Sequence, residues 1–451
     1  MSEHITADLG SHSHDIEDFE RLLYHVGDAS APLNRWRQLL QSVSPRGWSA
    51  VKEYAADVMK LIAQPRVLFT AAVALRASGP KAPGPNKLRL EWLTGEELWE
   101  MCTVLGKAID SGIYRPGKER VHWVQKMSGS GKRPIVLSDV QDRVVQKAAA
   151  LVLRSMLDPL FDPLSFAFRP LRRREQAIAV AEKLATGGCP VWLTHDLKDA
   201  FCRVPLSRLL DVVFKLLPCP RLRAFLGRIL PPQSRRLRGI KQGGPLSPLM
   251  LELYLTHFLH LPWRKAGHDV RIVRYADDLL LAVADHEKAA AVDAALRKLL
   301  TPAGMLLKAK YEEAVQDIRT KPAQWLGFEF HLDNTQFQVR LGKHAFEKLA
   351  RRFVLAHSKC RSTERAQQVL KSWASQLGPC YRWEDRESIC TQAITLAHGY
   401  GFEETLDVPQ LVEEWKAAKK RWQATRTEVR KEPGYMAEGP IPVPSPTLKV
   451  R

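Results

Sequence analysis

Cysteine is scarce in this sequence, and its distribution argues against the common cysteine-based frameworks. The chain has seven cysteines, an odd number, and no two of them form a C-x-x-C pair. Disulfide scaffolds use even numbers of cysteines, and zinc ribbons use closely spaced pairs. We therefore expect free, mostly buried thiols.

Long apolar runs are also missing. Runs such as Leu279 to Val283 are far too short to cross a bilayer. The first 22 residues are acidic and polar, and they lack the basic-then-apolar order of a signal peptide. From these two absences we expect a cytoplasmic protein that does not act at a membrane.

Negative charge is in deficit. The chain has 49 Asp and Glu residues against 68 Lys and Arg residues, which gives a net charge of +19. A field of this sign favours polyanions, so nucleic acid is the leading partner and an anionic membrane surface is the weaker alternative. Charge alone does not decide between them.

Helical and β-rich patterns alternate along the chain, and no internal repeat is found. Apolar residues recur at helical spacing before residue 80 and again from about residue 344. Short β-rich runs mix with helical ones over 189–335, which is typical of an α+β protein. Two β-rich runs around a Gly/Ser turn predict a hairpin over 121–137. The last twenty residues carry five prolines and are expected to be disordered.

Two adjacent carboxylates, Asp277 and Asp278, stand between two apolar runs. This pattern predicts that they lie at the tip of a tight β-hairpin. Adjacent carboxylates repel each other, and a bound cation would relieve the repulsion. An exposed Asp-Asp turn without function is the alternative interpretation of the pair alone.

A third carboxylate, Asp196, ends another apolar strand. If this strand neighbours the acidic hairpin in one sheet, the three carboxylates converge on an oxygen-only site that suits Mg²⁺. Two such ions roughly 4 Å apart can activate a primer 3′-hydroxyl and stabilise a pyrophosphate leaving group. Asp199 competes with Asp196 for this role, but its place inside the following turn favours a structural or capping role.

A loop rich in glycine and proline over 235–248 leads into a predicted helix. Its glycines allow close approach of the backbone to a ligand, and the helix entry presents free N–H groups to anions. Taken alone, the loop is equally typical of any helix entry.

Three motifs in this order resemble the palm motifs of reverse transcriptases: D-L-K-D-A-F, Q-G-G-P-L-S-P and Y-A-D-D. The Pro-Leu-Ser-Pro form is closest to the group II intron lineage. Further matches follow the same order and extend the resemblance over about 81–335. They are Lys126, G-K-R-P-I at 131–135, D-R-V-V-Q at 142–146, S-F-A-F-R-P at 165–170 and W-L-G-F at 325–328.

The resemblance implies an α+β fold with the right-hand polymerase architecture. The expected units are a helical N-terminal extension over 1–80, fingers over 81–190, a palm with the catalytic carboxylates over 191–335, a helical thumb over 336–430 and the proline-rich tail over 431–451.

The resemblance also assigns roles to single residues. Asp196, Asp277 and Asp278 would be catalytic and would hold two Mg²⁺ ions, with Mn²⁺ as a possible substitute. Lys126 and Arg133 would bind the incoming triphosphate. Further substrate contacts follow for Phe201 as a barrier to a ribose 2′-hydroxyl, for Gln242 and Gly243 around the base pair, and for Tyr275 behind the primer end. A core aromatic is the alternative for Phe201.

The basic clusters gain a use from this resemblance. Arg172 and Arg173, and the trio Arg235, Arg236 and Arg238, are candidates for binding nucleic acid. The basic segment 416–431 is another candidate, although a solvated helix face explains it equally well.

Three places depart from the pattern of the lineage. Glu252 stands where the lineage usually has Asn, and Asn86 stands where an early Gly-x-Asp-Gly would have its Asp. The stretch 304–310 keeps the basic character of a further motif but not its usual Asn and spacing, and either Lys308 or Lys310 fits its phosphate-contacting position.

The resemblance implies an RNA-directed DNA polymerase that adds dNMP to a primer on an RNA template. The compact build resembles free-standing bacterial enzymes that copy a dedicated, structured non-coding RNA in phage defence. The alternatives are a degenerate intron-derived, maturase-like RNA-binding protein and a polymerase that makes DNA without an external template.

Overall fold

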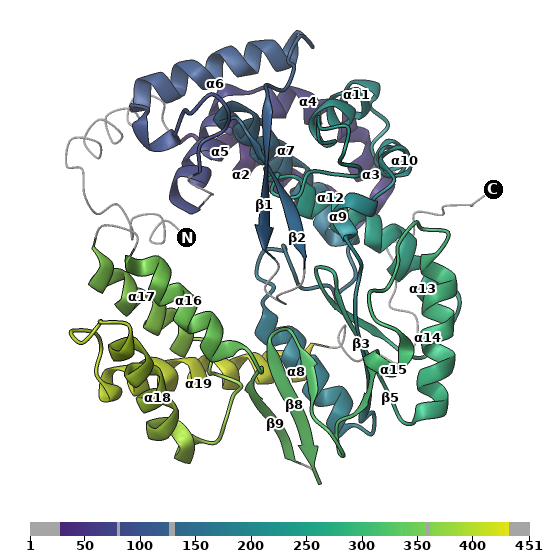
Figure 1. The fold of residues 1–451 in the computed structure, drawn as a ribbon. Helices are drawn as coiled ribbons and strands as arrows, with labels where there is room; N and C mark the ends of the chain where they lie inside the picture. Colours follow the sequence, from purple (N-terminus) through teal and green to yellow (C-terminus); the bar gives the residue numbers. More distant parts are fainter. Residues whose placement is uncertain (1–27, 79–81, 126–130, 335, 358–360, 433–451) are drawn as a thin grey trace.

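The computed structural model describes residues 28–78, 82–125, 131–334, 336–357 and 361–432. The predicted substrate residue Lys126 and nearly all of the predicted tail lie outside these ranges. Figure 1 shows the N-terminal helices at the top, the antiparallel sheets below them and the C-terminal helices at the lower left, beside the sheets.

The N-terminal region is helical, as its periodicity predicts. Its first helices pack around α7, which is buried along most of its length. The helix α6 begins with a capping box, in which Thr94 and Glu97 each accept a backbone N–H from the other. The helices are α2 (Ala31–Val43), α3 (Trp48–Lys52), α4 (Asp57–Ile62), α5 (Pro65–Ser78), α6 (Gly95–Asp110) and α7 (Val140–Leu157).

The predicted hairpin consists of β1 (Glu119–Gln125) and β2 (Lys132–Ser138), which pair antiparallel. It extends from the N-terminal helices toward the larger sheet (Figure 1). The end of β1 and the beginning of β2 therefore point toward the strands that carry the carboxylates (Figure 1).

The central sheet is antiparallel, with the strand order β4-β5-β3-β6. Successive side chains of a strand point to opposite faces. Val191 and Leu193 therefore enter one hydrophobic core, while Trp192 between them enters a second. The strands are β3 (Val191–Asp196), β4 (Ile272–Tyr275), β5 (Asp278–Val283) and β6 (Val315–Asp317).

Helices cover both faces of this sheet. The first core includes side chains of α7, α10, α11, α12 and α14, and the second includes those of α8 and the C-terminal helices. Between α12 and α13 the chain forms a π-helical turn, Thr256–His260. The helices are α8 (Arg174–Thr186), α9 (Ala200–Arg203), α10 (Leu206–Leu216), α11 (Pro220–Ile229), α12 (Ser247–Leu255), α13 (Leu261–Lys265), α14 (His286–Leu300) and α15 (Tyr311–Ala314).

A second antiparallel sheet contains β7 (Ala323–Trp325), β8 (Phe328–Asp333) and β9 (Gln336–Leu341). The sequence pattern predicts one β-rich run over 324–332, and the structure divides it into a hairpin. Leu326 and Gly327 both have positive φ angles, +50° and +82°, as a two-residue type I′ turn requires. Strand pairing continues in β9, within the range where the sequence predicts the thumb.

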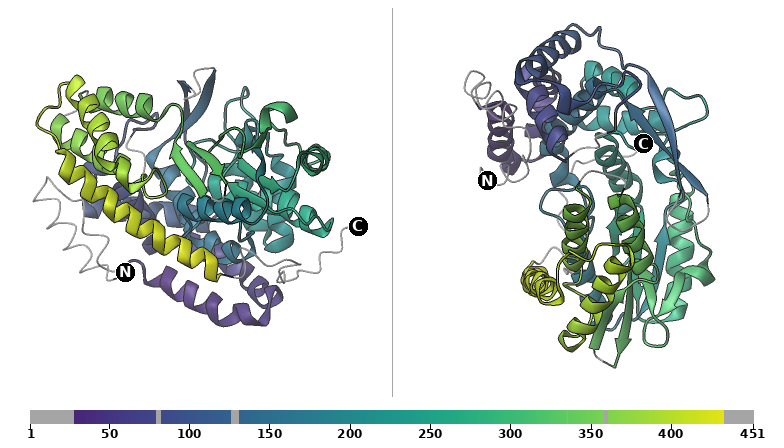
Figure 2. Two further views of the ribbon diagram at one scale, coloured as in Figure 1. Left: turned by 90° about the horizontal axis from the view of Figure 1, so that it is seen from below. Right: turned by 60° about the vertical axis from the view of Figure 1, so that its left-hand side comes forward.

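The C-terminal region is helical, and its last helix packs against α8. Figure 2 shows this long helix, in yellow, at the periphery of the molecule in both views. The helices are α16 (Ala345–His357), α17 (Ser362–Ala374), α18 (Arg386–Gly399) and α19 (Val408–Lys431).

In the described part of the chain, no single helix is long and apolar enough to span a membrane. The segments Trp48–Ile62 and Pro65–Ala77 reach that composition only together, and they are bent by 74°.

We predict that Gly239→Ala destabilises the fold more than Gly112→Ala. Both glycines have similar positive φ angles, +79° and +77°, so both substitutions strain the backbone. A Cβ at Gly239 would also overlap the carbonyl oxygen of Phe201, whereas nothing lies near Gly112. Thermal unfolding should show an additional loss of about 1–3 kcal/mol at Gly239. Equal losses would contradict the close packing of this loop against α9.

Candidate functional site

The pairing of β3 with β5 brings two of the predicted carboxylates together. Asp196 and Asp278 are direct partners in this antiparallel ladder. The next pair along the ladder is hydrogen-bonded, because Leu197 N donates to the Asp277 carbonyl at 2.9 Å. Asp196 and Asp278 therefore form a non-hydrogen-bonded pair, in which side chains on one face approach most closely, with Cβ atoms about 4.5–5.5 Å apart.

The third carboxylate lies in the turn that joins β4 to β5. Tyr275 pairs with Asp278, which leaves Ala276 and Asp277 as the two turn residues. Ala276 has a φ of +60° and Asp277 does not have a positive φ, the pattern of a type II′ turn. Glycine is the usual residue at that first position, so Ala276 is strained.

The three carboxylates influence one another electrostatically. Burial, together with the negative charges of Asp277 and Asp196, raises the pKa of Asp278 to about 7, against the opposing charge of Lys308. Burial also raises the pKa of Asp277, against the opposing effects of its own backbone N–H and of Arg133, Arg274 and Lys308. The charged forms of these carboxylates are unfavourable in the site as it stands. A bound cation would stabilise them.

The three carboxylates, Asp196, Asp277 and Asp278, are chemically suitable ligands for a divalent metal ion. Among the described residues, no group of three or more His, Cys, Asp or Glu side chains is clustered at metal-binding distances. The site nevertheless offers only hard oxygen donors that repel one another. Mg²⁺ typically takes one or two carboxylates and completes its coordination with water and substrate phosphates.

Lys308, one of the two candidate lysines, lies at this site. Its Nζ is 3.7 Å from Asp196 Oδ2, and its backbone N donates to the Asp196 carbonyl at 2.9 Å. Its segment is held by Arg297, whose Nη2 donates to the carbonyl of Ala309 at 2.9 Å. Lys310 instead begins the short helix α15. Sequence reasoning left this choice open because the two lysines are only two positions apart.

The glycine-rich loop is attached to the β1–β2 hairpin. Val136 N donates to the Gln242 carbonyl at 2.8 Å, and Gly243 is packed against β2 so closely that a Cβ would lie 3.1 Å from Val136 O. Lys241 Nζ lies 2.6 Å from Glu119 Oε1, with both side chains almost fully buried. The hairpin and the loop are therefore joined by a backbone hydrogen bond, close packing and a buried ion pair.

The remaining predicted substrate residues lie on elements that meet at this end of the sheet. Arg133 is exposed on β2, and its charge reaches Asp277. Phe201 is half-buried on α9, and its carbonyl accepts from Ile240 N at 3.0 Å. Tyr275 is half-buried and faces the same side of the sheet as Asp278.

The predicted nucleic-acid residues differ in their availability. Arg235, Arg236 and Arg238 are exposed on the loop after α11. Arg173 is exposed at the start of α8, but Arg172 lies 3.6 Å from Glu432 in an ion pair. Arg172 is therefore partly committed to an intramolecular contact.

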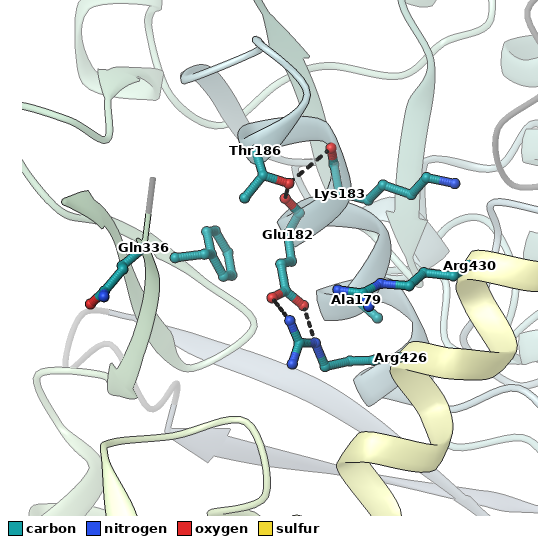
Figure 3. A pocket seen from close by; sticks show the side chains of 8 residues that line it. Ala179, Glu182, Lys183, Thr186, Gln336, Arg426 and Arg430 are labelled. Carbon is teal, nitrogen blue, oxygen red and sulfur yellow. Dashed lines mark hydrogen bonds and ion pairs between the residues drawn. The ribbon is translucent and has the colours of Figure 1, made fainter. Parts of the chain in front are cut away.

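A pocket of about 480 Å³ lies elsewhere, between α8, β9 and α19 (Figure 3). Glu182 on α8 accepts two hydrogen bonds from Arg426 on α19, at 2.8 and 2.6 Å, across this pocket. None of the catalytic or substrate residues predicted from the sequence lines it. We assign it no part in the chemistry at the carboxylates.

The family described as reverse transcriptase (RNA-dependent DNA polymerase) matches residues 124–330. This match contains all three carboxylates, the glycine-rich loop and Lys308. Residues 124–330, a little under half of the chain, are therefore similar to reverse transcriptases. The α+β class and the right-hand polymerase architecture implied by the motifs are thereby confirmed.

Two curated proteins are similar to this part of the chain, and one of them is encoded by a group II intron. The group II intron-encoded protein LtrA of Lactococcus lactis subsp. cremoris is 20% identical over 225 residues, which are 48% of this chain and 37% of LtrA. Protein YkfC of Escherichia coli (strain K12) is 27% identical over 214 residues, which are 45% of this chain and 55% of YkfC. The matched segment thus covers about a third to a half of each relative.

A solved structure of telomerase from Candida albicans in complex with a telomeric RNA fragment is also similar. It has 12% identity and a TM-score of 0.35, over 72% of this chain and 67% of that chain. A similarity at this TM-score carries no further argument.

We predict that Asp278→Asn stabilises the metal-free protein at neutral pH but not at acidic pH. The pKa of Asp278 is about 7 in the folded protein and 3.8 when unperturbed, so its contribution to stability is present below pH ~4 and is lost as pH rises toward 7. Asn cannot ionise. The variant's advantage should therefore grow from pH 4 to 7, to on the order of 2 kcal/mol.

Thermal melts in EDTA at several pH values measure this advantage, and added Mg²⁺ should narrow it. If the difference in stability between variant and wild type does not change with pH, the pKa of Asp278 is not raised by its surroundings.

Proposed function

We propose that this chain is an RNA-directed DNA polymerase that adds dNMP to a primer end on an RNA template. The observation that supports this most directly is the pairing of Asp196 with Asp278 beside the Asp277 turn, within a reverse transcriptase domain. Two Mg²⁺ ions at these carboxylates would activate the primer 3′-hydroxyl and stabilise the pyrophosphate leaving group.

The surrounding side chains would bind and orient the substrates. Arg133 and Lys308 are cations within electrostatic reach of Asp277, and they would hold the triphosphate of the dNTP. Gln242 and Gly243 would shape the pocket around the templating base pair. Tyr275 would support the primer end beside Asp278.

The positive charge outside the site supports a nucleic-acid partner. Exposed arginines at 235, 236 and 238 and the net charge of +19 favour binding of a phosphate backbone. We propose that the template is a dedicated, structured non-coding RNA, and that the protein acts with it in the cytoplasm in a bacterial defence system.

Two alternatives lead to different results in one assay. A degenerate, intron-derived RNA-binding protein would bind RNA without incorporating dNTP, although the three carboxylates favour catalysis. A polymerase without an external template would incorporate dNTP when the RNA is left out.

We predict that Asp277→Asn combined with Asp278→Asn abolishes dNTP incorporation on a primed RNA template and preserves folding and RNA binding. The substitution removes two mutually repelling charges, so the apo protein loses nothing in stability. Primer extension, a thermal melt and an RNA-binding titration measure the three properties. Incorporation by the folded double variant would place the chemistry elsewhere.

We predict that Phe201→Ala increases the use of rNTPs. If the half-buried ring occupies the space of a ribose 2′-hydroxyl, it acts by repulsion and adds little to dNTP binding. The ratio of kcat/KM for a dNTP and its matching rNTP, on the same primed RNA, measures this selection. An equal loss of both activities would make Phe201 a core residue that supports Asp196.

A further inference from the structure

An arginine is fully buried in the strand that leads into the acidic turn. Arg274 is 0% exposed, and it lies on the face of the sheet opposite to Tyr275 and Asp278. Its strand neighbours on that face are Leu279 and Leu281, which belong to the first core. Apolar side chains of similar volume would fill such a position at least as well.

Every nitrogen of this guanidinium has an acceptor. Nη2 donates to Glu252 Oε1 on α12 at 2.6 Å, and Nε donates to His260 Nε2 at 2.8 Å. Nη1 donates to the carbonyl of Ala276 at 3.1 Å. The side chain of Arg274 therefore joins a helix, the π-helical turn and the acidic turn from beneath.

The bond to Ala276 falls on the strained residue of the site. Ala276 has a positive φ, and its carbonyl precedes Asp277 directly. A conformation of this kind persists where the surrounding structure enforces it. The planar fork of an arginine can hold two acceptors in fixed directions, so the position of Glu252 sets the direction of Nη1.

Arg274 is itself held in place by neighbouring groups. His260 accepts from Arg274 through Nε2, so its proton is on Nδ1, which lies 3.6 Å from Asp162 Oδ2. Burial and the charge of Arg274 lower the pKa of His260 to about 4, which keeps the ring neutral against the partial opposition of Asp162. The backbone of Arg274 also bonds to Leu164 and Phe166.

We propose that Arg274 and Glu252 are positioning residues that fix the Ala276–Asp277 turn in its catalytic geometry. This inference rests on the proposed polymerase function. Glu252 stands where the sequence pattern predicts Asn, which is shorter and carries no charge to balance a buried guanidinium. The position of Arg274, and with it the geometry of the turn, thus depends on the carboxylate of Glu252, which the motif does not predict.

The test is an apolar replacement of the whole pair, Arg274→Met with Glu252→Leu. Each single substitution leaves one buried charge without its partner and should lower the Tm. The double variant removes both charges and should restore the Tm. Its kcat should nevertheless fall about 100-fold, because the turn has lost the Nη1 donor. KM for dNTP should stay within about threefold of wild type.

A matched control is Arg426→Met with Glu182→Leu, which replaces the hydrogen-bonded ion pair shown in Figure 3. This control should keep both Tm and kcat near wild type. A double Arg274/Glu252 variant with wild-type Tm and kcat would overturn the proposal, since the pair would then only fill space.

Two further measurements cover the remaining outcomes. If the double variant does not fold, Arg274→Lys keeps the charge but cannot reach both Glu252 and Ala276. A kcat loss of about tenfold or more at preserved Tm supports the proposal, and a wild-type kcat overturns it. If wild type incorporates no dNTP, the proposed function fails by itself. Mn²⁺ binding, measured by calorimetry, then tests the positioning role. We expect a folded variant to bind Mn²⁺ about tenfold more weakly than wild type, and unchanged binding would contradict the proposal.

Discussion

The register between β3 and β5 is the constraint on which the site depends. Because side chains alternate along a strand, a shift by one residue would move Asp196 to the opposite face from Asp278. The same alternation sends Val191 and Leu193 into one core and Trp192 into the other. Both faces of the sheet are covered by hydrophobic cores, so a shifted register would turn a carboxylate toward a core and move the apolar side chains into the wrong core. Packing therefore enforces the geometry of the acids.

The cost of this arrangement is electrostatic. Two hydrophobic cores pack against the strand that begins at these adjacent acids. Burial therefore raises the pKa values of Asp277 and Asp278. The chain offsets part of this repulsion with Lys308 on the open side and Arg274 beneath the turn. These cations differ in kind: Lys308 is more than half exposed, whereas Arg274 cannot leave its acceptors. One suits a substrate contact, and the other suits a fixed support.

Local patterns predicted much of the architecture, since strand, turn and acid occur together in each motif. They did not predict the turn at Leu326 and Gly327, because an apolar residue with positive φ opposes its own propensity and only pairing with β8 enforces it. Lys308 was not separable from Lys310, because the choice depends on backbone bonds to distant Asp196. The sequence likewise did not predict that Arg274 pairs with Glu252, because Glu252 lies on α12 and Arg274 on β4.

The net charge of the chain overstates what nucleic acid can use. On α19, Arg426 bonds to Glu182, Lys416 pairs with Glu413, and Lys419 donates to two carbonyls of the loop between α17 and α18. The contacts of Arg426 and Lys419 attach the last helix to the rest of the protein, whereas the Lys416–Glu413 pair lies within the helix. Part of the basic composition of α19 is therefore structural. The exposed arginine trio after α11 has no ion pair among the described residues, and it adjoins the loop that contacts the β1–β2 hairpin. The arginine trio is thus a better candidate for long-range attraction of a phosphate backbone than the helix with the most basic sequence.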